Sequence, residues 1–228
     1  MNTAASPSPT EPFDIDEVFR HLRAALADLP KAAMFDLRDR GYATPFEQLV
    51  SSLISARTRD ETTMVVSLRL FEVARTPEAM AALDEETLAQ LLNGASFPEP
   101  KARDIRELSR RIVEDYGGVV PNTMVGLTAF RGVGPKIAAL TLAVGFAQAA
   151  IAVDIHVHRI VNRWGYVQAT TPEATMAALE RKLPRDYWIE INERCVPFGK
   201  FICVGVGPKC STCTLRSMCA RVGVTSSR

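Results

Sequence analysis

The stretch Phe130-Arg131-Gly132-Val133-Gly134-Pro135-Lys136 decides how this sequence folds, and an apolar segment from Ile137 to Phe146 follows it directly. No strand pattern precedes the stretch, and Ile137 stands where a dinucleotide-binding loop needs its third glycine, so that kind of loop is excluded. A short helix from Asn122 to about Ala129, the glycine turn and the apolar helix would together make a helix–hairpin–helix. Gly132 and Gly134 let backbone amides face outward at the positive end of the second helix, where a DNA phosphate can bind. An ordinary turn between two helices would give the same local pattern.

The rest of the chain also has helical patterns. Thr44-Pro45-Phe46-Glu47 is a capping box with proline at the first helical position, and an apolar stripe at helical spacing follows it. Further helix starts are predicted at Asp14, Asp60, Thr76, Asp84, Asn122 and Thr171. Alternating strand patterns are nearly absent. We therefore predict an all-α protein with about nine or ten short helices.

The charge of the chain is balanced overall and uneven locally. The 228 residues include 27 basic and 26 acidic side chains, so a basic coat over the whole molecule is excluded and a polyanion would need a local patch. From Cys195 to the end there is no carboxylate side chain, whereas five basic residues occur there: Lys200, Lys209, Arg216, Arg221 and Arg228. A phosphate-facing surface would have this composition, and so would a solvated chain end.

No export or membrane segment is predicted. The N-terminus lacks a basic region followed by an apolar run, and Met1 to Pro12 has the Ser, Thr, Ala and Pro content of a disordered tail. The longest uncharged stretch, 137–153, has 17 residues and includes polar ones. A membrane-spanning helix needs about 20 predominantly apolar residues. We expect a cytoplasmic protein, associated with the nucleoid if the host is bacterial, that does not contact a membrane.

Four of the five cysteines lie close together, with the spacing Cys203-x6-Cys210-x2-Cys213-x5-Cys219. Clustered thiols without a secretory signal favour a metal site in a reducing compartment over disulfides. Four thiolates can hold a tetrahedral metal ion or an iron–sulfur cluster, and buried apolar cysteines are the alternative. Cys195 is outside this set and is predicted to be a core thiol.

Lys136 and Asp154 are candidates for one catalytic pair. The helical rise from residue 136 to about 147 is roughly 16 Å, and seven extended residues can return roughly 20 Å. Asp154 can therefore come back beside the start of the helix that carries Lys136. A partly desolvated amine at a helix N-terminus favours its neutral form, which can attack a sugar carbon and form a Schiff base. A nearby carboxylate can stabilise a cationic sugar transition state. Alternatively, Asp154 only caps the next helix and Lys136 is a surface charge.

Taken together, these motifs resemble the endonuclease III family of DNA glycosylases. The glycine turn with Lys136, the segment Ala152-Val153-Asp154-Ile155-His156-Val157-His158-Arg159 and the four-cysteine tail agree with it in order and interval. The agreement covers roughly residues 38 to 220, including Ser55-Ala56 before Asp60 and Lys101-Ala102 after a proline-rich loop.

The resemblance implies a fold and a set of functional residues. Lys136 would be the Schiff-base nucleophile and Asp154 the catalytic carboxylate. The cysteines 203, 210, 213 and 219 would hold a 4Fe–4S cluster in a loop that presents Lys209 and Arg216 to the DNA backbone. Residues 38–148 would form a six-helix barrel domain with the helix–hairpin–helix, and residues 13–37 with 149–228 a cluster domain, beyond a disordered tail at 1–12. A flipped base would enter the cleft between the two domains.

Two loops depart from the pattern of the family. Arg57 stands where glutamine usually follows Ser-Ala, in the segment that fills the gap left by the flipped base. Phe97 lies in Ala95-Ser96-Phe97-Pro98-Glu99-Pro100, where a Gly-Leu-Tyr type of sequence is more usual. Arg57 could hydrogen-bond the orphaned base and Phe97 could intercalate, although Phe97 could also be a core residue. His156 matches a family position near the site and could orient Asp154 or a phosphate, or be a structural histidine.

The sequence therefore predicts a base-excision-repair DNA glycosylase with AP lyase activity. It would remove oxidised pyrimidines from duplex DNA through a lysine Schiff base, and its partner would be double-stranded DNA with damaged bases or abasic sites. We expect a monomer. Two alternatives stay open: a monofunctional glycosylase that acts on mismatched or damaged bases, and a non-catalytic iron–sulfur protein that binds damaged DNA.

Overall fold

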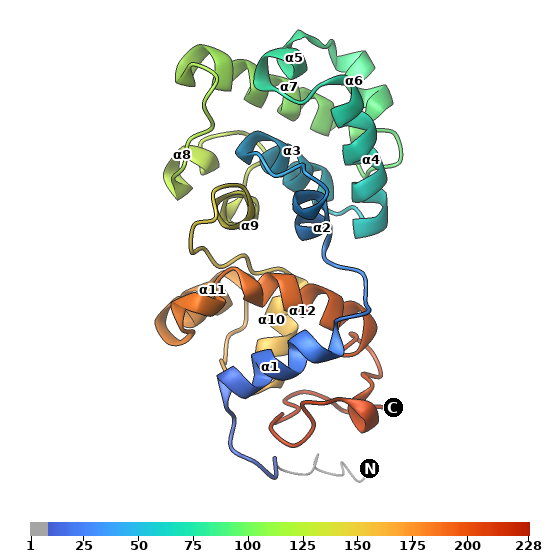
Figure 1. Cartoon of the computed structure of the whole chain (residues 1–228), viewed down its shortest axis with the longest axis vertical. Helices are drawn as coiled ribbons and strands as arrows, with labels where there is room; N and C mark the ends of the chain where they lie inside the picture. Colours follow the sequence, from blue (N-terminus) through green and yellow to red (C-terminus); the bar gives the residue numbers. More distant parts are fainter. Residues whose placement is uncertain (1–8) are drawn as a thin grey trace. The chain divides into compact units, whose positions relative to one another are not determined.

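The computed structural model describes residues 9–228, and every regular element in that range is a helix (Figure 1). The predicted all-α class is confirmed. The helices are α1 (Ile15–Ala25), α2 (Ala33–Asp39), α3 (Pro45–Ser55), α4 (Asp60–Val73), α5 (Pro77–Ala82), α6 (Glu85–Leu91), α7 (Pro98–Tyr116), α8 (Met124–Thr128), α9 (Pro135–Leu140), the π-helix η1 (Thr141–Gly145), α10 (Ile155–Arg163), α11 (Pro172–Lys182), the 3-10 helix η2 (Arg185–Tyr187), α12 (Glu190–Phe201) and the 3-10 helix η3 (Cys210–Thr212).

The described chain divides into two compact units, each of which we describe by itself. One unit is Ala33–Ala152, and the other joins the residues up to Ala32 to Val153–Arg228. The domain boundaries expected from the sequence lie a few residues away. The one expected after residue 37 falls inside α2, whose Met34, Phe35 and Leu37 are buried and therefore belong with the helices that follow.

The unit Ala33–Ala152 is built around α3. Nine consecutive residues of α3, from Phe46 to Ile54, are buried, because α2, α4, α7, α9 and η1 all contact this helix (Figure 1). The predicted capping box at its start is present: Thr44 Oγ1 accepts from the Glu47 amide, and the Glu47 carboxylate accepts from the Thr44 amide. Arg75 also donates to this nearly inaccessible carboxylate at 2.7 Å. The start of α3 is therefore fixed by local and tertiary contacts together.

The longest helix of this unit is α7. It packs against α5 and α6, and it buries Ala102, Ile105, Leu108 and Ile112 on its apolar stripe. Near its end, Arg111 donates to the Ala129 carbonyl at 3.0 Å and stacks on the Phe130 ring. The turn between α8 and α9 is thus anchored to a rigid element.

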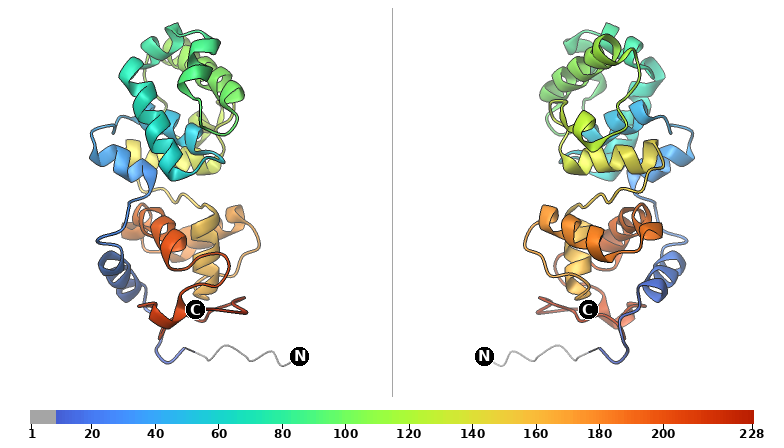
Figure 2. Two further views of the ribbon diagram at one scale, coloured as in Figure 1. Left: turned by 90° about the vertical axis from the view of Figure 1, so that its right-hand side faces the viewer. Right: turned by 90° about the vertical axis from the view of Figure 1, so that its left-hand side faces the viewer.

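The second unit surrounds α12 with α1, α10 and η2 (Figure 2). Phe19 of α1 stacks on Tyr187 with ring centroids 4.0 Å apart, and Arg23 forms an ion pair with Glu190 at 2.6 Å. The residues after α12 form a loop whose one regular element among the described residues is η3. No helix within residues 9–228 combines the length and apolar character that crossing a membrane requires.

Part of the tail expected to be disordered is tied to this loop. The amides of Thr10 and Glu11 both donate to the Ser217 carbonyl, at 2.9 and 3.1 Å. The disorder expected for residues 1–8 lies outside the described residues. The backbone amides of residues 10 and 11 therefore have an acceptor. The Ser, Thr, Ala and Pro content of the segment does not by itself determine whether these residues are ordered.

Candidate functional site

The helix–hairpin–helix predicted from the glycine-rich stretch is present, with α8 and α9 joined by a short turn. Gly132 has a left-handed backbone (φ +80°), and a Cβ there would lie 3.0 Å from Asp104 Oδ2 and 3.3 Å from Leu53 Cδ2. Gly134 has an extended backbone, and a Cβ there would meet nothing within 4 Å. The fold therefore requires glycine at 132, whereas the space beside Gly134 is open to a ligand.

Lys136 is the second residue of α9, directly after this turn. Ile137, Ala138, Ala139 and Leu140 are buried, so the first turn of α9 is held firmly. The Lys136 side chain itself is half-buried. Within its own unit, its amine has no hydrogen-bond or ion-pair partner among the described residues. The helix predicted for 137–146 is observed as α9 followed by η1, which presents the amine at the helix start.

Asp154 is the N-cap of α10 in the other unit. Its Oδ1 accepts from the amides of His156 and Val157, both at 2.9 Å. The capping role considered from the sequence is therefore real. Because both bonds go to Oδ1, and no described residue of the unit is seen bonding to Oδ2, the same carboxylate keeps an oxygen for other chemistry. Capping and catalysis are compatible at this residue.

His156 is held by Arg159, which donates to its Nδ1 at 3.0 Å and to the Gly199 carbonyl at 2.9 Å. The helices α10 and α12 cross closely at this point. A Cβ on Gly199 would lie 2.5 Å from His156 Nδ1 and 2.8 Å from Arg159 Nη2. His156 therefore has a structural partner, one turn along the helix that Asp154 caps.

Arg57 and Phe97, from separate loops of the unit Ala33–Ala152, lie together. The Arg57 guanidinium is 5.3 Å from the centroid of the Phe97 ring. Phe97 is 55% exposed, so its interpretation as a core residue is wrong. Both residues have left-handed backbones, with φ of 59° and 57°. Non-glycine residues in this region cost about 1–3 kcal/mol each, so the surrounding contacts must hold them there.

Lys101 is a buried polar residue beneath these two loops that the sequence analysis did not single out as functional. It is 8% exposed, and its Nζ donates to the Ile54 and Ala56 carbonyls and to Thr58 Oγ1. Burial lowers the pKa of Lys101 to about 8. In the sequence, Lys101 was marked only by its agreement with the family at Lys101-Ala102 and by its place beside an apolar stripe, and neither reveals which acceptors it meets.

The four clustered cysteines line a single cavity of about 20 Å³ in the other unit, with Trp164 and Phe198 on its apolar wall. Burial raises the pKa of Cys213 and of Cys219 to about 11. Arg163 donates to Cys203 Sγ at 3.4 Å, and the Arg221 amide donates to Cys219 Sγ at 3.4 Å. Among the described residues, no three His, Cys, Asp or Glu side chains are arranged to hold a single metal ion.

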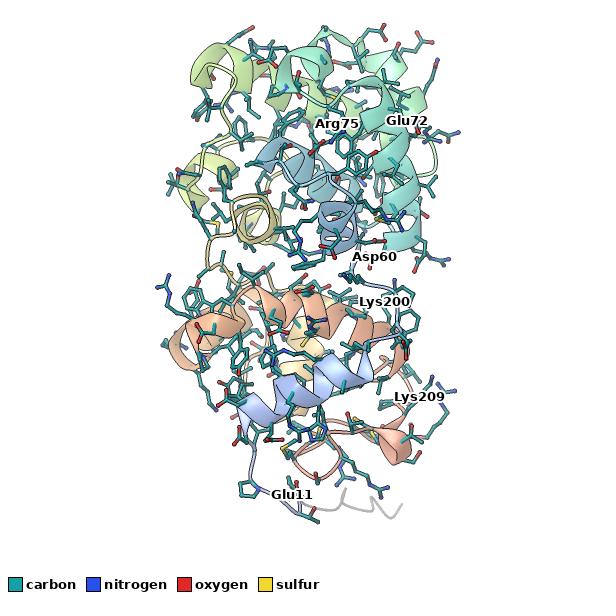
Figure 3. All side chains as sticks on the ribbon, in the orientation of Figure 1. Glu11, Asp60, Glu72, Arg75, Lys200 and Lys209 are labelled. Atoms are coloured by element: carbon teal, nitrogen blue, oxygen red, sulfur yellow. The ribbon has the colours of Figure 1, made fainter. Side chains whose placement is uncertain are left out.

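The chemistry of this donor set fits an iron–sulfur group. Four cysteines line one cavity, and N–H groups point at the sulfurs of Cys203 and Cys219, as occurs around such clusters. Lys209 and Arg216 lie on the same loop and are exposed, and Figure 3 shows the Lys209 side chain extending from it. Cys195 is fully buried elsewhere in the unit, as predicted.

Comparison with known proteins places the chain in a family. Residues 50–185 match the HhH-GPD superfamily of base excision DNA repair proteins. Endonuclease III of Thermotoga maritima is 45% identical over 182 residues, covering 80% of this chain and 85% of that protein. Endonuclease III-like protein 1 of Gallus gallus is 35% identical over 208 residues, covering 90% of this chain and 74% of that protein.

Two solved structures agree with these relatives. A non-covalent endonuclease III–DNA complex matches with a TM-score of 0.78 and 28% identity over 91% of this chain and 94% of that one. A trapped endonuclease III–DNA covalent intermediate matches with a TM-score of 0.77 and 28% identity over 90% and 95%. The chain therefore belongs to the HhH-GPD superfamily and, within it, to the endonuclease III family. It is a DNA glycosylase of base excision repair, of the kind for which AP lyase activity is typical.

Proposed function

We propose that the protein removes oxidised pyrimidines from duplex DNA and then nicks the strand, with Lys136 as nucleophile and Asp154 as catalytic carboxylate. The observation that carries this proposal is the position of Lys136. Its amine stands on the first turn of α9, next to the turn in which Gly134 leaves open space. A phosphate bound at that turn would bring a deoxyribose close to the amine.

The chemistry follows from a neutral amine and an electrophilic sugar carbon. Lys136 Nζ attacks C1′ as the bond to the damaged base breaks, and the base leaves with the bonding electrons. The C1′–O4′ bond then breaks as a proton from Nζ passes to O4′, so that the sugar ring opens to an imine between Nζ and C1′. Loss of a proton from C2′ then expels the 3′ phosphate and cuts the strand. Asp154 stabilises the positive charge that develops on the sugar as the base departs.

The remaining expected residues would bind DNA around this chemistry. The turn with Gly132 and Gly134 would take a backbone phosphate, and Lys209, Arg216 and His156 would meet others. Arg57 would occupy the space that the flipped nucleotide vacates, because a base must leave the stack before its glycosidic bond can be reached. Phe97 would wedge the opposite strand by intercalation. The phosphate contacts ignore base sequence, which suits a protein that searches DNA for damage.

Cys203, Cys210, Cys213 and Cys219 would hold a 4Fe–4S cluster. When bound, such a cluster supplies four strong links that order the loop carrying Lys209 and Arg216. The protein would act as a monomer in the cytoplasm, where the chromosome is accessible if the host is bacterial.

Borohydride trapping tests the nucleophile. Reduction during turnover on a single-lesion duplex should give a covalent protein–DNA species with wild type and none with Lys136→Ala. The exposed Lys31→Ala is the matched control and should trap normally. Undiminished trapping in Lys136→Ala would exclude it as the nucleophile. Base release without nicking would favour a monofunctional glycosylase, and tight binding without release a non-catalytic protein.

A further inference from the structure

We propose that Lys101 is a positioning residue that locks Arg57 and Phe97 into one wedge and thereby sets how the enzyme engages the strand opposite the lesion. The proposal rests on the proposed function of those two residues in DNA binding. Lys101 does not reach the surface itself, so it would act through the loops that it holds.

The contacts of Lys101 account for every N–H of its ammonium group. Nζ donates to the Ile54 carbonyl at 2.6 Å, to the Ala56 carbonyl at 2.8 Å and to Thr58 Oγ1 at 2.9 Å. The two carbonyls lie at the C-terminus of α3, where partial negative charge gathers and helical carbonyls lack intrahelical partners. Lys101 itself stands on the first turn of α7. One side chain therefore ties the end of α3 to the start of α7.

A second set of bonds joins the same two segments. Thr58 Oγ1 also accepts from the Ser96 amide at 3.1 Å, and Ser96 Oγ donates to the Arg57 carbonyl at 2.7 Å. Thr58 is thus shared between Lys101 and Ser96. The segments 54–58 and 96–101 form one hydrogen-bonded body, although about forty positions separate them in the sequence.

These two bonded segments, 54–58 and 96–101, hold Arg57 and Phe97 in place. Arg57 and Phe97 both have left-handed backbones, and Pro98 follows Phe97 directly. Such conformations persist where the surroundings over-determine them, and they cluster at ligand-binding segments. The exposed Phe97 ring and the Arg57 guanidinium stack on each other 5.3 Å apart. Their direction therefore depends on the bonds beneath them, of which Lys101 makes three.

Lysine at this position brings both a cost and a gain in stability. Burying an ammonium group has a desolvation cost that a methionine of similar length would avoid, whereas methionine would leave three acceptors without their donor. The lysine does what methionine cannot: it fixes the carbonyls on either side of Ser55 and the hydroxyl of Thr58 at once. Its contribution is therefore expected in the geometry of the wedge.

The test uses Lys101→Met in the full chain with its cluster. The probe is a duplex with a stable abasic-site analogue and 2-aminopurine opposite it, whose fluorescence reports stacking of the orphaned base. Wild type should change this fluorescence on binding, and Lys101→Met should lose most of that change.

A second measurement is the rate of base excision. In Lys101→Met, single-turnover excision from a lesion duplex should fall about 10- to 100-fold, as expected for a misplaced group. Ser109→Ala, a buried α7 variant whose hydroxyl bonds only within the helix, is the control and should match wild type.

A double-mutant cycle separates positioning from general damage. If Lys101 acts through Phe97, Phe97→Ala combined with Lys101→Met should be little worse than Phe97→Ala alone, because the two effects share one element. The proposal would be overturned if the losses in excision rate of the two single variants multiplied in the double variant. A normal 2-aminopurine response in Lys101→Met would also overturn it. If Lys101→Met does not fold, as judged by its melting curve, Lys101→Gln keeps two donors and is put through the same measurements. The abasic duplex does not require base excision, so its result stands even if wild type proves inactive on lesions.

Discussion

Asp154 caps α10 and is also the proposed catalytic carboxylate, and substitution can separate these two roles. Asp154→Asn keeps an oxygen that can accept from the His156 and Val157 amides, so the free energy of unfolding should change by less than about 1 kcal/mol. The variant loses the negative charge opposite the developing sugar cation, so base excision should slow about 100-fold or more.

Urea unfolding and single-turnover excision measure these two quantities. Asp84→Asn is a control, since the Asp84 side chain also caps a helix, α6, and has no proposed role in chemistry. If Asp154→Asn excised the base at the wild-type rate, the carboxylate would have no part in the mechanism.

Individual residues were predictable from the sequence where their role is local. The capping by Asp14, Thr44, Thr76, Asp84 and Thr171 follows from side chains that reach amides two or three positions away, and all five caps are present. The role of Lys101 is not local, because its acceptors come from another helix. No pattern around a lysine reveals which carbonyls it will meet.

At the scale of the element, the two glycines of the hairpin should respond differently to alanine. Gly134→Ala should leave the free energy of unfolding nearly unchanged, because its backbone is extended and its Cβ would meet nothing within 4 Å. Its affinity for duplex DNA should nevertheless fall, because a methyl group would keep a phosphate from the backbone amides.

Gly132→Ala should lose at least about 1 kcal/mol of stability, from its left-handed backbone and its close contacts. Thermal unfolding and titration of a non-cleavable duplex distinguish these effects. Equal DNA affinity in Gly134→Ala and wild type would place the phosphate elsewhere.

Most helices were predictable because apolar spacing and caps agree, and the exceptions have physical reasons. The helix α4 begins at Asp60, but its N-cap is Arg59, which makes no side-chain capping bond, so the predicted cap is wrong. The cap of α8 is Thr123 rather than the predicted Asn122. The helix α2 follows Ala32 and has no capping side chain, so its stability comes from burial against other helices, which the local sequence does not record.

At the scale of the whole molecule, the order of the loop with the four clustered cysteines should depend on the proposed iron–sulfur cluster. Residues 202–228 contain little regular structure, so binding of a cluster would supply much of the energy that orders them. Cys213→Ser should therefore lose iron, yellow-brown colour and resistance of this loop to proteolysis.

Cys195→Ala, which changes the one cysteine outside the cavity, should keep its iron. Iron analysis, the visible spectrum and mass spectrometry of proteolytic fragments measure the iron content, the colour and the resistance to proteolysis. Stoichiometric zinc and no colour in wild type would contradict the cluster.

The division into units was only approximately predictable, because it depends on packing rather than on composition. The chain passes from one unit to the other between Ala32 and Ala33 and returns between Ala152 and Val153, and neither place has the Gly- or Ser-rich sequence of a flexible linker. The four thiols, by contrast, were predictable as a group, because they cluster within a short segment and one pair has the Cys-x-x-Cys spacing of metal ligands.

The crossing of α10 over α12 limits how this enzyme can diverge. Even the smallest side chain at position 199 would overlap the imidazole of His156 and the guanidinium of Arg159. Saturation mutagenesis should thus find this glycine intolerant. An engineer seeking new substrates should leave the crossing intact and vary the exposed residues Arg57 and Phe97, the pair proposed to meet DNA.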